Sequence, residues 1–365
     1  MPESVTKILP EPRARVRGMK EYHPPLGSRD GLRLDFNENT VACSPAVSEV
    51  LGRISAGELT RYPERESVEA VVAAHLGLTP AQVSLTNGVD EGIHVLFEAF
   101  LDEGDELLLP VPTYTMYEVY ASATDARVIT VLAGDDLGFP FDRLVASVTP
   151  RTKIIAIANP NSPSGTMASR EQIVTLAQLA PQAVVLVDEA YFHFCGETVI
   201  DLVGEIPNLI IARTFSKAYG LAGLRVGVLA GPVELMHWIR RVLSPYSANS
   251  VALACLPAAF EDTVYLDWYV NEVVAARNDF ERALAAAGVR YWPSRANFVL
   301  VDIGPRHREF VQRMLAAGVL VRDRSSDPGC EGRVRITIGT RQQMQRAIAA
   351  MKEALADLSA REVRE

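Results

Sequence analysis

Three short apolar runs, each followed at once by polar residues, limit most strongly the folds open to this chain. Residues 183–187 read Ala-Val-Val-Leu-Val, and similar runs occupy 153–158 and 208–212. Continuous apolar runs of this length, rich in β-branched residues, are typical of parallel strands that are buried on both faces of a sheet. Ligands of such sheets bind at the carboxyl ends of the strands, so the polar residues after each run are candidate site residues.

Helical patterns alternate with these strands, for example at 67–76, 91–100 and 170–179. The alternation predicts an α/β fold with a mostly parallel central sheet and helices on both of its faces. From about residue 256 the pattern changes. The C-terminal part is expected to contain helices at 266–287, 308–317 and 341–358 and strands at 298–303, 319–322 and 334–338.

Lys217 follows the run at 208–212 and stands among hydroxyl groups and an arginine. Thr214 and Ser216 precede it, and Arg225 comes eight positions later. A lysine amine can form a Schiff base with a carbonyl compound, while hydroxyls and a guanidinium hold a phosphate by charge-assisted hydrogen bonds. The segment therefore predicts covalent binding of a phosphorylated carbonyl compound. The alternative, a lone lysine on a solvated loop, does not account for this spacing.

The run at 183–187 ends in Asp188, and Tyr191 follows three residues later. An aspartate at a strand end can keep a pyridine nitrogen protonated, which makes the ring an electron sink. Tyr191 could donate a hydrogen bond to a phenolic oxygen on such a ring. Asp188 could instead be the N-cap of the next helix.

Two further segments are suited to ligand binding. The run at 153–158 leads into 159–165, Asn-Pro-Asn-Ser-Pro-Ser-Gly, where two prolines and a glycine favour a rigid turn. Gly88 stands just before the expected helix at 91–100, where backbone N–H groups can point at a phosphate with the help of the helix dipole.

Taken together, these segments resemble the fold-type I pyridoxal-phosphate enzymes, specifically the aminotransferase class I/II group, and within it the histidinol-phosphate aminotransferases. The resemblance runs in unbroken order from about residue 34 to 350. It implies a PLP fold-type I sheet with a smaller α+β domain, the cofactor pyridoxal 5'-phosphate, and a homodimer. The matching motifs are at 36–39, 61–64, 87–92, 112–117, 188–191, 213–227 and 334–340.

The resemblance implies a role for each residue around the cofactor ring. Lys217 would form the Schiff base and later move a proton between substrate and cofactor. Asp188 would pair with the pyridinium nitrogen, and Tyr191 would donate to the phenolic oxygen. Tyr114 would stack on the ring, although spacing alone fits a core tyrosine equally well.

The resemblance also implies a cup for the cofactor phosphate. Backbone amides of Val89 and Asp90, placed by Gly88, would bind it together with Thr214, Ser216 and Arg225. Tyr62 resembles the tyrosine that reaches the phosphate of the neighbouring subunit, so the active site would need a dimer.

One position departs from the family pattern. Relatives carry asparagine immediately before the second proline of the 159–165 turn, where it bonds the phenolic oxygen; this chain has Ser162 there, preceded by Asn161. Either the shorter Ser162 acts through a water or a shifted loop, or Asn161 takes its place.

The substrate residues are likewise implied by the resemblance. Arg335 matches the arginine that clamps the substrate carboxylate, a task suited to its planar fork, and Asn297 would orient the same group. Arg322 matches the residue that histidinol-phosphate aminotransferases direct at the substrate phosphate, although related enzymes that act on aromatic amino acids can keep an arginine here. Tyr22 corresponds to their N-terminal tyrosine for that phosphate.

Composition narrows the class and the location. The 365 residues are 48% hydrophobic, which is enough for two domains. We expect a large cofactor-binding domain (45–255) and a small domain (31–44 with 256–365), preceded by a weakly ordered N-terminal arm (1–30). A net charge of −9 argues against nucleic-acid binding. No apolar run reaches the length of a membrane span. The four cysteines and six histidines form no metal pattern, and the cysteines suit a reducing cytoplasm.

The sequence therefore predicts a cytoplasmic, homodimeric, pyridoxal-phosphate-dependent aminotransferase of amino-acid biosynthesis. It would transfer an amino group between an amino acid or amine phosphate and a 2-oxo acid, as histidinol-phosphate:2-oxoglutarate enzymes do. Two alternatives stay open on the same scaffold: an aromatic or specialised-metabolite aminotransferase, and a threonine-phosphate decarboxylase. A non-catalytic binding module would be expected to lack Lys217 or Asp188.

Overall fold

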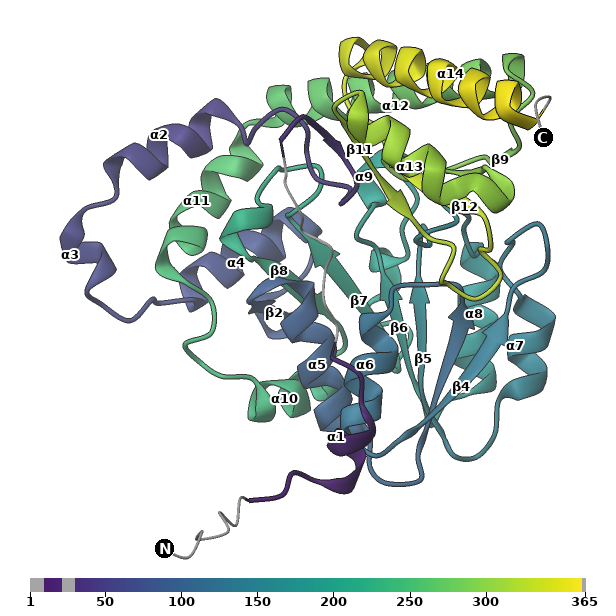
Figure 1. The fold of residues 1–365 in the computed structure, drawn as a ribbon. Coiled ribbons are helices and arrows are strands. Elements are labelled where there is room, and N and C mark those ends of the chain that lie inside the picture. Colours follow the sequence, from purple (N-terminus) through teal and green to yellow (C-terminus); the bar gives the residue numbers. More distant parts are fainter. Residues whose placement is uncertain (1–9, 22–29, 363–365) are drawn as a thin grey trace, which may run out of the picture.

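A computed structural model describes residues 10–21 and 30–362, and in these residues the strands form two sheets (Figure 1). The larger sheet has seven strands in the order β2-β8-β7-β6-β5-β3-β4. β8 is antiparallel to both of its neighbours and the other pairs are parallel, which confirms the mostly parallel sheet. The strands are β2 (Val83–Thr86), β3 (Glu106–Val111), β4 (Arg127–Leu132), β5 (Thr152–Ala158), β6 (Val184–Asp188), β7 (Leu209–Thr214) and β8 (Gly227–Ala230).

Helices cover both faces of this sheet because successive strand residues point to opposite sides. On β5, Ile155 and Ile157 belong to the apolar cluster that contains residues of α4, α7, α8 and α11, whereas Ile154 and Ala156 belong to the cluster that contains residues of α5, α6 and α10. The helices are α4 (Glu66–Leu76), α5 (Gly88–Phe100), α6 (Met116–Ala123), α7 (Phe141–Ser147), α8 (Arg170–Leu179), α10 (Val233–Val242) and α11 (Ser250–Glu261).

The C-terminal part builds a second sheet with its own core, in the order β1-β11-β12-β10-β9. The strands are β1 (Leu32–Leu34), β9 (Tyr291–Trp292), β10 (Phe298–Asp302), β11 (Val319–Asp323) and β12 (Arg333–Thr337). α12 (Thr263–Ala286), α13 (His307–Ala316) and α14 (Arg341–Glu362) pack in this part, at the top of Figure 1. The N-terminal strand β1 joins β11, in agreement with an α+β unit that includes residues 31–44. The domain boundaries themselves stay a prediction.

The described part of the N-terminal arm lies along the large sheet's helices. Its described residues contain a short helix, α1 (Ala14–Gly18), which lies against α6. Arg13 Nη2 donates to the carbonyl of Ala123 at 2.6 Å, and Arg15 Nε donates to that of Ser122 at 3.3 Å. Side-chain bonds to the carbonyl groups at the end of α6 thus attach this part of the arm to the large sheet's helices.

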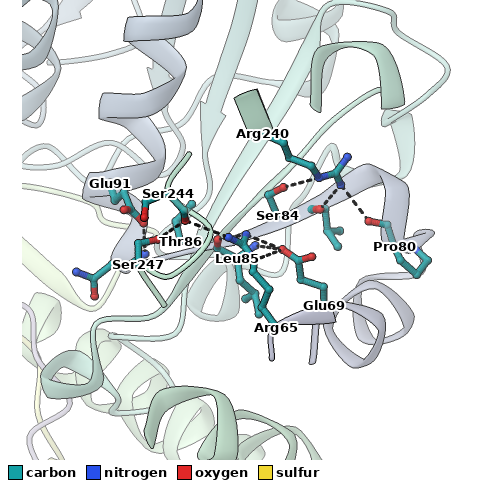
Figure 2. Close-up of polar contacts among 12 residues, drawn as sticks. Arg65, Glu69, Pro80, Ser84, Leu85, Thr86, Glu91, Arg240, Ser244 and Ser247 are labelled. Carbon is teal, nitrogen blue, oxygen red and sulfur yellow. Dashed lines mark hydrogen bonds and ion pairs between the residues drawn. The ribbon is translucent and has the colours of Figure 1, made fainter. Parts of the chain in front are cut away.

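Side chains form hydrogen bonds with backbone N–H and C=O groups at the free edge of β2 (Figure 2). Glu69 Oε1 accepts from the backbone N–H of Leu85 at 2.9 Å, and Arg65 Nη2 donates to the carbonyl of Leu85 and to Glu69 Oε1, both at 2.7 Å. Arg240 Nη2 donates to the carbonyl of Val83 at 2.6 Å. Since unpaired edge groups invite association with other strands or cost free energy when buried, these charged side chains protect the strand that leads to Gly88.

Substitution of Glu69 by alanine should lower the free energy of unfolding by about 3 kcal/mol, because it leaves the buried Arg65 charge without its carboxylate. Urea denaturation measures the change. Glu49→Ala is the matched control, since Glu49 forms the same i,i+4 pair with Arg53 but is exposed, and its loss should cost less than about 0.5 kcal/mol. Equal costs for the two variants would contradict a role for burial.

Candidate active site

The carboxyl ends of β5, β6 and β7 open into a cavity of about 330 Å³. Parallel strands end at the same edge of a sheet, so residues far apart in the chain meet there. The cavity brings together most of the residues expected at a cofactor site: Val89, Asp90, Tyr114, Ser162, Asp188, Tyr191, Thr214, Ser216, Lys217 and Arg225.

Lys217 lies three residues after the end of β7 and lines the cavity together with Phe36. Its Nζ donates to the carbonyl oxygen of Phe36 at 3.2 Å. Phe36 follows β1 of the second sheet, so the amine lies where the two sheets' segments meet.

Asp188 ends β6 and is almost fully buried. Its Oδ2 accepts from Tyr117 Oη at 2.7 Å and its Oδ1 from the backbone N–H of Ala190 at 3.0 Å. Burial raises the pKa of this carboxyl to about 6, although both hydrogen bonds oppose the shift. The next helix, α9 (Phe192–Cys195), has Tyr191 at its N-cap position without a side-chain cap, so Asp188 is not a helix cap.

Three strands meet in register next to the residues that are expected to bind a phosphate. Gly227 of β8 pairs with Thr86 of β2 on one side and with Thr214 of β7 on the other. A Cβ added at Gly227 would lie 2.6 Å from the backbone nitrogen of Val89 at the start of α5. The missing side chain thus lets β8 pass close to an N–H group at the helix N-terminus, a position suited to an anion.

Arg225 and Tyr114 converge on the carboxylate of Asp90. Arg225 Nη2 donates to Asp90 Oδ2 at 2.8 Å, and Tyr114 Oη donates to Asp90 Oδ1 at 2.6 Å. Arg225 has a left-handed backbone with φ of 51°, and a Cβ at Gly88 would lie 2.6 Å from its Nη2. Tyr114 is 37% exposed and lines the cavity, unlike a core tyrosine.

A second cavity of about 360 Å³ shares Lys217, Tyr114 and Tyr191 with the first and is also lined by three arginines: Arg322, Arg324 and Arg335. Arg322 of β11 and Arg335 of β12 are cross-strand partners. Sequence reasoning gave Arg324 no role, because its contribution depends on how the strand end packs.

Arg335 is the most buried of these arginines. Its Nη1 donates to Ser162 Oγ at 3.1 Å and its Nη2 to the carbonyl of Asp35 at 2.7 Å. Burial, together with repulsion from Arg324 and Arg322, lowers the pKa of its guanidinium to about 10. Arg335 Nε and Arg322 Nη1 are buried and have no hydrogen-bond partner among the described residues.

Arg333 and Arg335 are two residues apart on β12, so their side chains point to the same face of the second sheet, but their contacts differ. Arg333 donates to the carbonyl of Gly329 and lies over the ring of Trp292, 4.2 Å from its centroid. It does not line either cavity described above.

Asn161 does not line the two cavities, contrary to its expected cofactor contact. Its Nδ2 donates to the carbonyl of Pro112 and to Ser164 Oγ, both at 2.9 Å, and its Oδ1 accepts from Thr113 Oγ1 at 2.8 Å. These bonds hold its side chain within the turn. Ser162 lines both cavities instead, with its hydroxyl bound by Arg335.

Three expected residues lie apart from the cavities or outside the described chain. Asn297 is fully buried, and its Nδ2 donates to the carbonyl of Asn37 at 3.2 Å. Tyr62 is 79% exposed and its ring lies 4.6 Å from that of Tyr246. Tyr22 falls among residues that the structure does not describe.

In residues 10–21 and 30–362, no group of three or more histidine, cysteine, aspartate or glutamate side chains is arranged to hold a metal ion. No helix within those same residues has the length and apolar character needed to cross a membrane.

Comparisons with known proteins agree with this architecture. Residues 29–351 match the family model described as aminotransferase class I and II. The chain is 33% identical over 361 residues to histidinol-phosphate aminotransferase 2 of Methylococcus capsulatus, covering 93% of this chain and 97% of that protein. It is 32% identical over 350 residues to the histidinol-phosphate aminotransferase of Thermoanaerobacter pseudethanolicus, covering 94% and 98%.

The solved structures include a similar protein with a bound ligand. Histidinol-phosphate aminotransferase from Sinorhizobium meliloti, in complex with pyridoxal-5'-phosphate, has a TM-score of 0.87 and 25% identity to this chain. The alignment covers 96% of this chain and 99% of that one.

Gly227→Ala should weaken binding of inorganic phosphate at least about tenfold, because the new methyl group would displace the Val89 backbone N–H from its place. Isothermal titration with phosphate measures the affinity. Gly223→Ala is the control, because a Cβ there meets nothing within 4 Å and should leave the affinity unchanged. Unaltered phosphate affinity in Gly227→Ala would contradict the anion cup.

Proposed function

The chain belongs to the class I and II aminotransferases, and we propose that it is a pyridoxal-phosphate-dependent enzyme of the histidinol-phosphate:2-oxoglutarate type. The observation that carries this proposal is the placing of Arg322 and Arg335 beside Lys217 in one continuous site. One site would thus contain three kinds of group: a lysine amine, an aspartate for a ring nitrogen, and arginines for anionic groups of the substrate.

The residues of the first cavity fit pyridoxal 5'-phosphate. The Val89 amide, Thr214, Ser216 and Arg225 would hold its phosphate, since N–H, O–H and guanidinium groups line that side of the cavity. When bound, this cofactor supplies an electrophilic carbonyl group and an electron-withdrawing ring.

The ring and its substituents would contact a second group of side chains. Asp188 would hold a proton on the ring nitrogen, Tyr114 would cover the ring face, and Tyr191 would donate to the phenolic oxygen. Lys217 would bind the carbonyl carbon and, once the substrate has displaced it, move a proton at the substrate Cα.

The second cavity favours a substrate with an anionic group at some distance from its amine. Arg335 and Arg322 have buried N–H donors without partners among the described residues, and burial of such groups costs free energy until an anion binds. A phosphate monoester satisfies several donors at once, so an amine phosphate fits this cavity better than an uncharged aromatic side chain. Asn297 and Tyr22 stay predicted substrate residues.

We also propose that two copies of the chain form a homodimer, with a cytoplasmic location kept as a prediction from the sequence. The rings of Tyr62 and Tyr246 are tilted toward each other with their centroids 4.6 Å apart, and the two residues are 79% and 60% exposed; Leu59 and Val264 are 57% and 80% exposed. The exposed ring pair of Tyr62 and Tyr246 is the contact that we propose the second copy covers. Light scattering should give twice the 39.9 kDa mass of one chain, and Tyr62→Asp should shift the mass toward one chain.

With pyridoxal 5'-phosphate, the purified protein should develop a near-visible absorbance band that histidinol phosphate removes and 2-oxoglutarate restores. Lys217→Ala should lack this exchange and lose at least about 100-fold in rate, because no amine is left to bind the carbonyl and carry the proton. Stopped-flow absorbance measures both half-reactions.

Arg322→Met is the control for the substrate. It should keep the cofactor band but lower kcat/KM for histidinol phosphate by about 100-fold, as expected when one partner of a buried charge pair is lost. A reaction with phenylalanine in place of histidinol phosphate would instead identify an aromatic aminotransferase. Carbon dioxide release from threonine phosphate would identify a decarboxylase.

A further inference from the structure

Tyr117 is a fully buried tyrosine in the first turn of α6, and sequence reasoning gave it no role. Its hydroxyl donates to Asp188 Oδ2 at 2.7 Å. The other oxygen of the same carboxylate accepts from the backbone N–H of Ala190. Both oxygens of Asp188 therefore accept a hydrogen bond. One donor is in the same loop, and the other is in α6, the helix that follows β3 in the sequence.

Packing leaves the Tyr117 hydroxyl little freedom. The ring belongs to the apolar cluster between the sheet and α5, α6 and α10, together with Leu186 of β6. It also meets the ring of Tyr114 edge to face, with 5.6 Å between centroids. Because interiors are close-packed, the ring cannot turn without displacing these neighbours. The packing of the Tyr117 ring in this cluster thus sets where the hydroxyl lies.

The segment from Tyr114 to Tyr117 serves two carboxylates of the cavity. Tyr114 donates to Asp90, which pairs with Arg225 on the phosphate side. Tyr117 donates to Asp188. One short segment thus positions acidic groups that belong to α5 and to β6.

The hydrogen bonds to Asp188 favour its charged form, whereas burial disfavours it. Burial raises the pKa of Asp188 to about 6, and the bonds from Tyr117 and Ala190 oppose that shift because they stabilise the ionised form. Burial, with the charge of Asp188, raises the pKa of the Tyr117 phenol well above its usual value. Tyr117 therefore stays protonated and always acts as the donor.

We propose that Tyr117 is a positioning residue, whose hydroxyl holds Asp188 as an oriented, charged acceptor for the ring nitrogen of the cofactor. The inference rests on the proposed function, because it requires a nitrogen heterocycle in the cavity. A protonated, uncharged Asp188 would hold the ring nitrogen's proton only weakly, and the ring would then withdraw electrons less well. A tyrosine that merely fills space would act on binding through shape alone.

The test compares Tyr117→Phe with the unsubstituted chain for two ligands: pyridoxal 5'-phosphate and its 1-deaza analogue, in which a C–H group replaces the ring nitrogen. Tyr117→Phe keeps the ring and its packing. It should weaken binding of pyridoxal 5'-phosphate about tenfold, as expected for loss of a hydrogen bond to a charged group, and leave binding of the analogue unchanged. Fluorescence titration of the cofactor-free protein measures both affinities.

Tyr269→Phe is the matched control, since Tyr269 is equally buried but belongs to the core around α12 and lies outside both cavities. It should change neither affinity. In the loaded enzyme, Tyr117→Phe should lower kcat about tenfold and leave KM for the amine nearly unchanged.

Equal losses for both ligands in Tyr117→Phe, or no loss for either, would overturn the positioning role and leave the cofactor proposal intact. Failure of the unsubstituted chain to bind pyridoxal 5'-phosphate would overturn the proposed function, and this inference with it. Thermal denaturation of the cofactor-free variants separates a folding defect from a binding defect, because only the former lowers the melting temperature enough to affect both ligands.

Discussion

The site depends on strand ends that meet at one edge of the seven-stranded sheet. β5, β6 and β7 end there, and the antiparallel β8 begins there. Gly227 can lie in register between Thr86 and Thr214 because it has no side chain, and this brings the N-terminus of α5 close to the strand that follows Arg225. The lysine, the aspartate and the anion cup share a cavity for this reason.

Burial of charge is the second constraint. Asp188 and Arg335 are both almost fully buried, and burial moves the pKa of the carboxyl up to about 6 and that of the guanidinium down to about 10. Buried ionisable side chains lower the free energy of unfolding, and proteins retain such side chains mainly at active sites. At the β2 edge, by contrast, Arg65 and Glu69 pair directly with each other and with the strand, so their burial serves the fold.

Two sheets contribute to one site, and their contributions differ. The seven-stranded sheet supplies the residues around the first cavity, whereas β11 and β12 of the second sheet supply the arginines. Ser162 lines both cavities and accepts from Arg335, so the turn after β5 joins the two parts. The Ser162 hydroxyl is already hydrogen-bonded to the Arg335 guanidinium.

Much of the fold and of the first cavity could be predicted from the sequence, because apolar strand runs and the residues that follow them are local patterns. The strand at 183–187 and the helix at 170–179 were placed within a residue of β6 and α8. The roles of Tyr117 and Arg324 could not be predicted, since each depends on which neighbour packing brings within reach. Asn161 and Ser162 were two alternatives for one contact, because adjacent residues of a turn point in different directions and sequence spacing does not say which of them points into the cavity. In the structure, hydrogen bonds hold the Asn161 side chain within the turn.

The alternation of strands and helices, and the kinds of side chain at each strand end, follow from local patterns of amino acids. Which side chains meet depends on how the elements pack: Tyr117 reaches Asp188, Arg335 rather than Arg333 lines the cavity, and Asn161 is held within its turn. The physical reason is the distance along the chain over which each kind of interaction acts. Hydrophobic periodicity acts over a few residues, whereas a hydrogen bond between positions 117 and 188 exists only after two elements have packed.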